Sequence, residues 1–189
     1  MRKALVLGGS SDIGVGIVEE YLERGWSVVA HGNSWSGKAS TSIYERPDVI
    51  KFDLDLRDLV QVEEFIQSEK ELIEVDSIIN CIGNWKAGGY LNQSINEIED
   101  SFRANVFSPF LFVRAAIPRM RSRGWGRIVH LGSIGVKYGG GRNNVAYSWS
   151  KYSLEFIPAE FADWAKDHVF INIARIGVTD TRIHQLDSS

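Results

Sequence analysis

Residues 4–14, ALVLGGSSDIG, place a short apolar run, a glycine-rich turn and the start of a helical pattern in direct succession. The apolar run predicts a buried strand, and Ile13, Ile17 and Val18 then recur at helical spacing until Gly25, a natural stop. Glycine lets a backbone approach a ligand closely, and a helix N-terminus presents free N–H groups with a partial positive charge. The stretch therefore predicts a strand–turn–helix unit able to bind a pyrophosphate.

The rest of the chain repeats this alternation. Further strands are predicted at residues 27–30, 49–52, 77–81, 127–131 and 170–174, and helices at 59–70, from Ser94 to about 123 and at 146–167. Ser94 and Glu97 form a capping-box pattern, and Pro118 and Pro158 are expected to bend their helices. Residues 32–46 are polar and serine-rich, which predicts a mobile loop.

Strands that are apolar along their whole length indicate a parallel sheet covered on both faces. Right-handed crossovers then favour a doubly wound α/β fold of the Rossmann type, with three layers, α/β/α, and about six mostly parallel strands. The chain has 189 residues, enough for one well-buried domain, and it shows no internal repeat or linker. We therefore expect a single domain over residues 1–189.

Composition narrows the class of protein. The chain is 44% hydrophobic and 24% charged, and its net charge of −3 argues against a nucleic-acid partner. The lone Cys81 cannot form an internal disulfide, and no apolar leader is present. No apolar run approaches the ~20 residues of a membrane span. These features predict a soluble, cytoplasmic protein with no membrane partner, and the residues predict no metal site.

A second motif places Tyr147 and Lys151 four residues apart, which puts both side chains on one face of a helix. A phenol has a pKa of ~10, and a nearby ammonium lowers it, so such a pair can exchange protons near neutrality. Alone, the pair also fits an ordinary exposed helix face. The motif follows the strand that ends at Ser133, 14 residues before Tyr147.

Taken together, these segments resemble the short-chain dehydrogenase/reductase family, in its order and roughly its spacing, over residues 4–181. Gly8 and Gly14 match the first and last glycines of its T-G-x-x-x-G-x-G fingerprint, while Leu7 and Asp12 depart from it. A carboxylate facing a pyrophosphate would be repulsive, so Asp12 is expected to turn away and cap the helix. The alternative is a tight turn with no ligand.

The resemblance implies an oxidoreductase that depends on NAD(P) and transfers a hydride between the nicotinamide and a small carbonyl or alcohol substrate. Tyr147 would act as general acid and base, and Lys151 would lower its pKa and hold the nicotinamide ribose. Ser133 would hydrogen-bond the substrate oxygen where charge develops. Asn105 would support a water relay to the lysine; otherwise it is a helix residue bonded to local backbone.

The family match also implies a set of cofactor-binding residues. They are Gly8, Ser10, Ser11, Ile13 and Gly14 of the first turn, Asn33 and Ser34 after the second strand, Asp53 and Leu54 beside the adenine, Asn80 and Gly83 of an N-N-A-G-like turn, Tyr147 and Lys151, and Gly177 and Thr181 after the sixth strand. Asp53 could instead be a loop carboxylate, and Asn80 a strand-end residue bonded to neighbouring backbone.

The end of the second strand bears on the choice of cofactor. An Asp or Glu there would bind a ribose 2′-hydroxyl and repel a 2′-phosphate. The sequence has Asn33 and Ser34 instead, with Lys38 within reach of the loop. This predicts a preference for NADP, with NAD possible, although an ordinary polar loop would look the same.

Family members usually continue with a mobile substrate loop and a seventh strand, which this sequence lacks after Ser189. The chain is thus either a piece of a longer enzyme or a short form whose sixth strand is covered by another subunit. The family also implies a homodimer or homotetramer through residues 95–123 and 146–167. Two other functions stay open: a non-catalytic NAD(P)-binding sensor or scaffold, and a sugar-nucleotide epimerase or dehydratase of the extended branch, which shares the Tyr-x-x-x-Lys motif.

Overall fold

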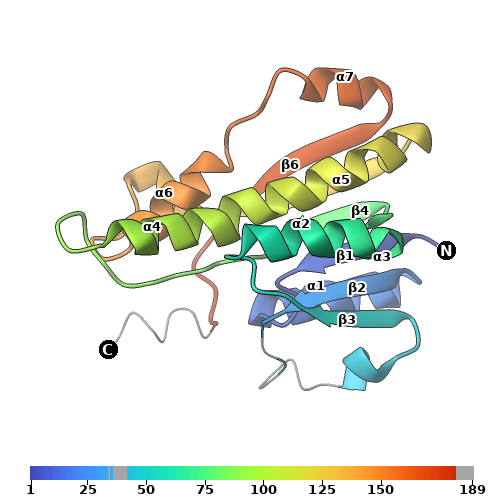
Figure 1. Cartoon of the computed structure of the whole chain (residues 1–189), viewed down its shortest axis with the longest axis horizontal. Helices are drawn as coiled ribbons and strands as arrows, with labels where there is room; N and C mark the ends of the chain where they lie inside the picture. Colours follow the sequence, from blue (N-terminus) through green and yellow to red (C-terminus); the bar gives the residue numbers. More distant parts are fainter. Residues whose placement is uncertain (34, 36–41, 182–189) are drawn as a thin grey trace.

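The computed structural model describes residues 1–33, 35 and 42–181. These residues form one six-stranded parallel sheet in the order β3-β2-β1-β4-β5-β6 (Figure 1). The strands are β1 (Lys3–Leu7), β2 (Ser27–Gly32), β3 (Val49–Asp53), β4 (Ser77–Asn80), β5 (Gly126–Ser133) and β6 (Val169–Ile176). The predicted doubly wound fold is confirmed, because the chain winds outward from β1 in both directions.

Helices connect the strands. They are α1 (Asp12–Glu23), α2 (Leu59–Ser68), α3 (Lys70–Ile73), α4 (Ile95–Phe102), α5 (Ser108–Ser122), α6 (Val145–Ser153) and α7 (Phe161–Lys166). Two short 3₁₀ segments, η2 (Ser42–Glu45) and η4 (Ile134–Tyr138), and a π-helical segment, η3 (Arg103–Phe107), complete the described elements. None of the helices in the described ranges is long and apolar enough to cross a membrane.

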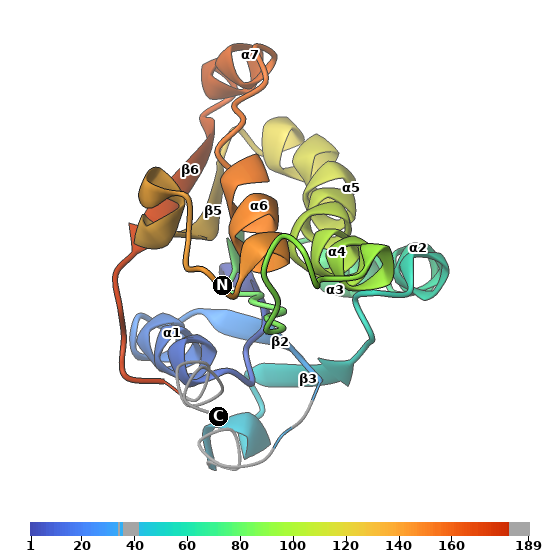
Figure 2. The ribbon, with the colours of Figure 1, turned by 90° about the vertical axis from the view of Figure 1, so that its left-hand side faces the viewer.

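Two buried clusters show the three layers. In β1, Leu5 and Leu7 belong to the cluster that packs under α2 and α5, whereas Val6 belongs to the cluster under α1. Successive side chains of a strand point to opposite faces, so a continuous apolar strand is what a sheet covered on both sides requires. Figure 2 shows α1 on one side of the strands and α2, α4, α5 and α6 on the other.

Three local expectations need correction. Ser11, not Asp12, is the cap of α1: its Oγ accepts from the Gly14 N–H at 3.0 Å, and Asp12 is the first helical residue. The long helix departs from α geometry at η3, just before Pro109, which has no N–H to donate to the Asn105 carbonyl, whereas α5 continues past Pro118 to Ser122. The helix predicted at 146–167 is interrupted rather than bent: α6 ends at Ser153, α7 begins at Phe161, and Pro158 lies between them. The capping box at Ser94 is present as predicted.

The parallel topology brings the carboxyl ends of all strands to one edge of the sheet. The first turn, the segment after β4, the end of β5 and the segment after β6 meet there, although they are far apart in sequence. In open α/β sheets this edge is where ligands bind. At one lateral end of the sheet, β6 is an edge strand of the described structure, and Phe170, near the amino end of β6, is 39% exposed.

Candidate active site

A cavity of about 480 Å³ lies at the carboxyl edge of the sheet. Eight of the residues predicted from the sequence line it: Ser11, Ile13, Gly83, Ser133, Tyr147, Lys151, Gly177 and Thr181. They come from five separate segments, so the fold assembles a site that no single motif could show. The cavity is also lined by Asp12, Cys81 and Trp85.

The turn before α1 depends on close backbone packing. Gly8 has a φ of +80°, and its carbonyl accepts from the Ser11 N–H at 3.0 Å. A Cβ on Gly14 would lie 2.1 Å from the Gly8 oxygen. The first turn of α1 therefore presses directly on the glycine turn, which brings its N-terminal N–H groups to the cavity at Ser11 and Ile13.

Lys151 is almost completely buried, with 2% of its surface exposed. Its Nζ donates to the Ile82 carbonyl at 2.5 Å and to the Leu131 carbonyl at 2.7 Å. Burial lowers the pKa of the ammonium to about 8. An ammonium has three N–H donors, so these two bonds still leave one donor for a ligand in the cavity.

The pKa of Tyr147 differs from the sequence expectation. Burial raises the pKa of its phenol, where a lowered value was expected from the neighbouring lysine. The Lys151 Nζ lies 5.8 Å from the centre of the Tyr147 ring and is engaged by two carbonyls. In this state Tyr147 is a protonated phenol at neutral pH, which is the form that can donate a proton.

Two further polar residues contribute to the site: Ser133 lines the cavity, and Asn105 is buried beside it. Ser133 Oγ accepts from the Gly135 N–H at 3.2 Å, so its own proton can still be donated into the cavity. Asn105 is fully buried; its Oδ1 accepts from Asn84 N at 2.7 Å, and its Nδ2 donates to Ser150 Oγ at 2.9 Å. Asn105 lies in η3, and π-helical turns often occur at functional sites.

Several predicted cofactor residues lie outside the cavity. Asn80 is buried; its Nδ2 donates to His130 Nδ1 at 3.2 Å, and its Oδ1 accepts from Ile82 N at 3.1 Å. This is the alternative considered from the sequence, a strand-end residue that fixes neighbouring backbone. Asp53 accepts from the Trp35 indole at 2.5 Å. Gly8, Ser10, Gly14, Asn33 and Leu54 also fall outside the lining.

Ser34 and Lys38 lie outside the described residues, so the structure does not place them. Three residues that support the site without lining the cavity were missed by sequence reasoning. Ser150 bonds Asn105 and donates to the Tyr147 carbonyl at 2.8 Å, which fixes the helix that carries the reactive pair. His130 accepts from Asn80, and His31 bonds Gly8. Only the position of His31 and His130 within apolar strands could have singled them out.

We expect the protein to lose stability in acid because of the side chain of His130. It is partly buried, and burial together with the Lys151 charge lowers its pKa to about 4. The unfolded chain, with a histidine pKa of ~6.5, binds the proton more readily, so stability present above about pH 6.5 is lost as the pH falls toward about 4. We expect His130 to contribute a loss of at most about 2 kcal/mol between about pH 7 and 5.

Urea unfolding at the two pH values measures this loss. A His130→Gln variant keeps an acceptor for Asn80 but does not titrate, so its unfolding free energy should fall less over the same interval. Equal pH dependence in both proteins would show that His130 is not the group responsible.

The doubly wound sheet, with a glycine-rich turn and a cavity at the carboxyl ends of its strands, defines the Rossmann class of nucleotide-binding folds. A family model described as short chain dehydrogenase matches residues 2–189. The chain therefore belongs to the short-chain dehydrogenase/reductase family, as the resemblance of its motifs implied.

Two relatives of this chain are reductases by name. The ketoacyl reductase HetN of Nostoc sp. is 31% identical over 157 residues, which cover 81% of this chain and 54% of HetN. The 3-oxoacyl-(acyl-carrier-protein) reductase FabG of Buchnera aphidicola is 27% identical over 182 residues, covering 95% of this chain and 74% of FabG. The chain thus spans about half the length of the first relative and about three quarters of the second.

A solved structure of the same kind supports the fold. The crystal structure of a 3-oxoacyl (acyl-carrier-protein) reductase from Agrobacterium tumefaciens, with NADP bound, is 25% identical, with a TM-score of 0.84 over 97% of this chain and 72% of that one. That protein binds its dinucleotide on a fold that this chain shares.

Proposed function

We propose that this chain is the cofactor-binding and catalytic part of an NAD(P)-dependent oxidoreductase that interconverts a carbonyl and an alcohol. The observation that carries the proposal is that one cavity gathers Ser133, Tyr147 and Lys151 with the N-terminus of α1. A non-catalytic sensor would need the helix terminus but no proton donor. The names of the relatives make a 3-oxoacyl thioester the first substrate class to test.

The residues present fit a dinucleotide. The close contact of Gly14 with Gly8 holds the α1 N-terminus against the glycine turn, and the cavity continues from Ser11 to Tyr147 and Thr181. The α1 N–H groups would hold the pyrophosphate. The nicotinamide, when bound, supplies the hydride. The third N–H of Lys151 would hold the adjacent ribose.

The chain itself supplies the proton and the stabilising contacts. Tyr147, protonated because burial raises its pKa, would donate its proton to the substrate oxygen in reduction and take it back in oxidation. Ser133 would donate a hydrogen bond to the same oxygen as negative charge develops on it. Asn105 and Ser150 would hold the helix that carries Tyr147 and Lys151 in register with the segment after β4.

We expect NADPH to be preferred over NADH. The strand β2 ends at Gly32, the next residue is the exposed Asn33, and the carboxylate of Asp53 beside Gly32 is already bonded to Trp35. Steady-state kinetics should give NADPH a kcat/KM at least about tenfold higher, equivalent to about 1.4 kcal/mol. An Asn33→Asp variant adds a carboxylate that repels the 2′-phosphate, so the preference should shift toward NADH.

The neutral variant Asn33→Ser serves as the control for this experiment, because it changes the side chain without adding charge. The proposed preference is wrong if the unmodified protein uses NADH better than NADPH. NADPH binding without reduction of any carbonyl in a broad panel would instead favour the sensor function.

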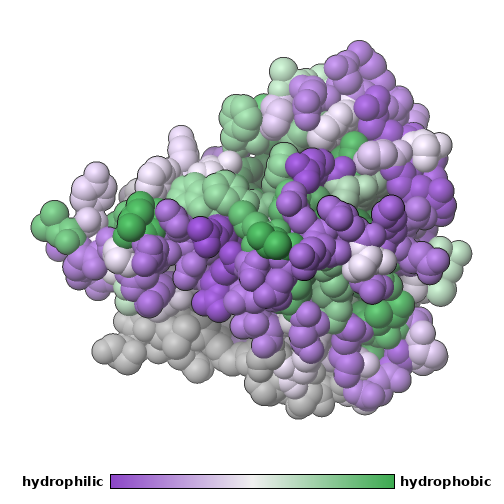
Figure 3. All heavy atoms as spheres, viewed as in Figure 1, coloured by the Kyte–Doolittle hydropathy of each residue, from purple (hydrophilic) through white to green (hydrophobic). Residues whose placement is uncertain are grey.

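The outer faces of α4, α5 and α6 support the expected oligomer. Phe107, Phe110, Trp149 and Tyr152 are between 45% and 61% exposed, and Trp149 packs edge-on against Phe102 at 5.0 Å, which joins α6 to α4. Figure 3 shows hydrophobic groups among polar ones along the α4–α5 face. Such a surface favours burial against another subunit.

A charged substitution at this face should reduce the oligomer to a monomer. We expect Phe110→Asp to lower the mass measured by sedimentation velocity, because a buried carboxylate would have no partner in the interface. The control Val60→Asp places the same charge on an exposed residue of α2 and should leave the mass unchanged. A monomeric unmodified protein would contradict the proposal.

A further inference from the structure

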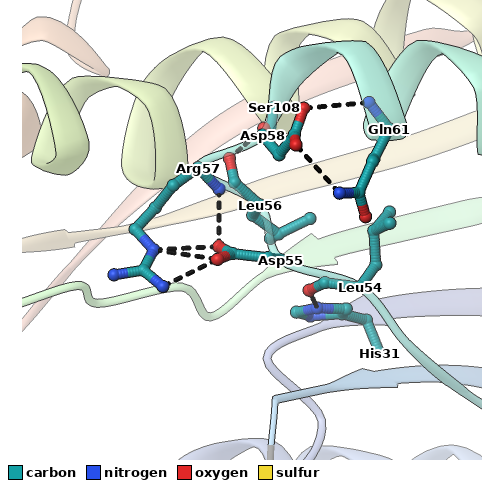
Figure 4. A network of polar contacts seen from close by, with 8 residues as sticks. All are labelled: His31, Leu54, Asp55, Leu56, Arg57, Asp58, Gln61 and Ser108. Atoms are coloured by element: carbon teal, nitrogen blue, oxygen red, sulfur yellow. Dashed lines mark hydrogen bonds and ion pairs between the residues drawn. The ribbon is translucent and has the colours of Figure 1, made fainter.

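His31 joins two segments that approach the proposed cofactor. Its side chain is 3% exposed. Its Nδ1 accepts from the Gly8 N–H at 3.2 Å, and its Nε2 donates to the Leu54 carbonyl at 2.8 Å; the second bond is drawn in Figure 4. A carbonyl can only accept and a backbone N–H can only donate, so both bonds form together only in the neutral ring with its proton on Nε2.

The segment that contains Leu54 is held from its other side by α5. Ser108 Oγ donates to the Leu56 carbonyl at 2.5 Å, and Asp55 pairs with Arg57 at 2.7 Å (Figure 4). These contacts position the segment against the helical layer. His31 connects this segment by hydrogen bonds to Gly8, where the phosphate-binding turn begins.

A second proton on His31 would break this connection. Nδ1–H would face Gly8 N–H, so two donors would oppose each other in a buried site with no acceptor between them. The carboxylates of Asp53, from β3, and Asp55, from the following turn, favour the charged ring, whereas burial opposes it more strongly and lowers the pKa of His31. The ring also packs against Phe52 at 5.3 Å.

We infer that His31 is a positioning residue for the dinucleotide: its neutral Nε2–H form sets the distance between the pyrophosphate turn and the adenine-side segment, and the cofactor binds weakly once the ring is protonated. This inference rests on the proposed function, because it requires that the dinucleotide binds along these two segments. It also makes cofactor affinity pH-dependent through a residue outside the reactive constellation.

Reciprocal linkage supplies a test on the unmodified protein. If NADPH binds the neutral ring preferentially, NADPH must lower the pKa of His31. The imidazole signals of His31, followed by NMR against pH with and without NADPH, should titrate at a lower pH in the complex. An unchanged titration would overturn the inference, and this measurement does not depend on any variant folding or turning over substrate.

Binding of NADPH to His31→Gln gives the second readout. Glutamine can still donate to Leu54 but cannot titrate or accept from Gly8 in the same geometry. We expect its dissociation constant to be about tenfold higher than that of the unmodified protein at neutral pH. The ratio should fall toward one as the pH is lowered through the titration of His31 that the NMR measurement gives. Using the ratio cancels the titration of the 2′-phosphate, which both proteins share.

The control is His168→Asn, which replaces an exposed histidine at a left-handed position that asparagine tolerates. Its affinity for NADPH should match that of the unmodified protein at every pH. A ratio for His31→Gln that stays constant with pH would overturn the role of His31 while leaving the proposed function intact. Failure of every protein to bind NADPH would overturn the proposed function and this inference with it.

Discussion

Tyr147→Phe is expected to lower kcat by about 100- to 10,000-fold, because it removes the hydroxyl that protonates the substrate oxygen. The ring stays in place, so the cavity keeps its shape, and Lys151 keeps its bonds to Ile82 and Leu131. The dissociation constant for NADPH should therefore change little. Steady-state kinetics and cofactor binding, measured on the same preparation, separate the two effects.

Tyr152→Phe is the matched control for this substitution. Tyr152 lies on the same helix, α6, but is 61% exposed and does not line the cavity. It should retain full turnover. If Tyr147→Phe kept near-normal turnover with a good substrate, the assignment of Tyr147 as the acid would be wrong.

Gly14→Ala is expected to have the largest effect on the cofactor site without touching a reactive group. The added Cβ would lie 2.1 Å from the Gly8 oxygen and 2.8 Å from the Gly9 Cα, both backbone atoms that cannot rotate away. Overpacking of this kind typically costs 1–3 kcal/mol, and the rigid neighbours here favour a loss of about 3 kcal/mol. Binding of NADPH should fall at least about 100-fold if α1 is pushed off the turn.

Gly16→Ala provides the comparison on the same helix. Nothing lies within 4 Å of a Cβ at this position. Alanine is the better helix former, so Gly16→Ala should raise the free energy of unfolding by about 0.5–1 kcal/mol and leave NADPH binding intact. Urea unfolding of both variants measures these two opposite changes in stability. Equal stability and affinity would mean that the close contact of α1 with the turn is unimportant.

The fold was predictable because its signals are local and repeated. Each strand is a continuous apolar run, and each is separated from the next by helical spacing or a turn, so the alternation alone indicates a parallel sheet. The capping box at Ser94 was predicted in the same way, from a local sequence pattern. Boundaries differed by a few residues: β5 and β6, for example, both extend further toward the cavity than expected.

The N-cap of α1 was harder to predict from the sequence, because Ser11 and Asp12 are both good capping residues and only the backbone conformation distinguishes them. The π-helical segment lies just before Pro109, and its Asn105 bonds Asn84 and Ser150, which come from distant parts of the chain. The pKa of Tyr147 depends on burial and on where the Lys151 ammonium points. Neither can be read from a spacing of four residues.

His31 shows most clearly what the sequence cannot reveal. Within an apolar strand it resembles any buried polar residue, and its two partners, Gly8 and Leu54, become neighbours only when β1, β2 and β3 pair. The motif residues, by contrast, could be predicted because each follows a strand at a recognisable sequence spacing. The chemistry of the reactive pair could therefore be predicted, whereas the contacts that position the cofactor turns could not.

In the proposed reaction, Tyr147 supplies the proton that accompanies hydride transfer to a carbonyl in this cavity. The direct measurement uses NADPH that carries deuterium on the transferring carbon of the nicotinamide, with a panel of carbonyl substrates led by 3-oxoacyl thioesters, and mass spectrometry of the products. We expect deuterium on the carbinol carbon of a product made by the unmodified protein, and almost none with Tyr147→Phe. Equal labelling by both proteins, or no labelled alcohol from any carbonyl while NADPH is bound, would contradict it.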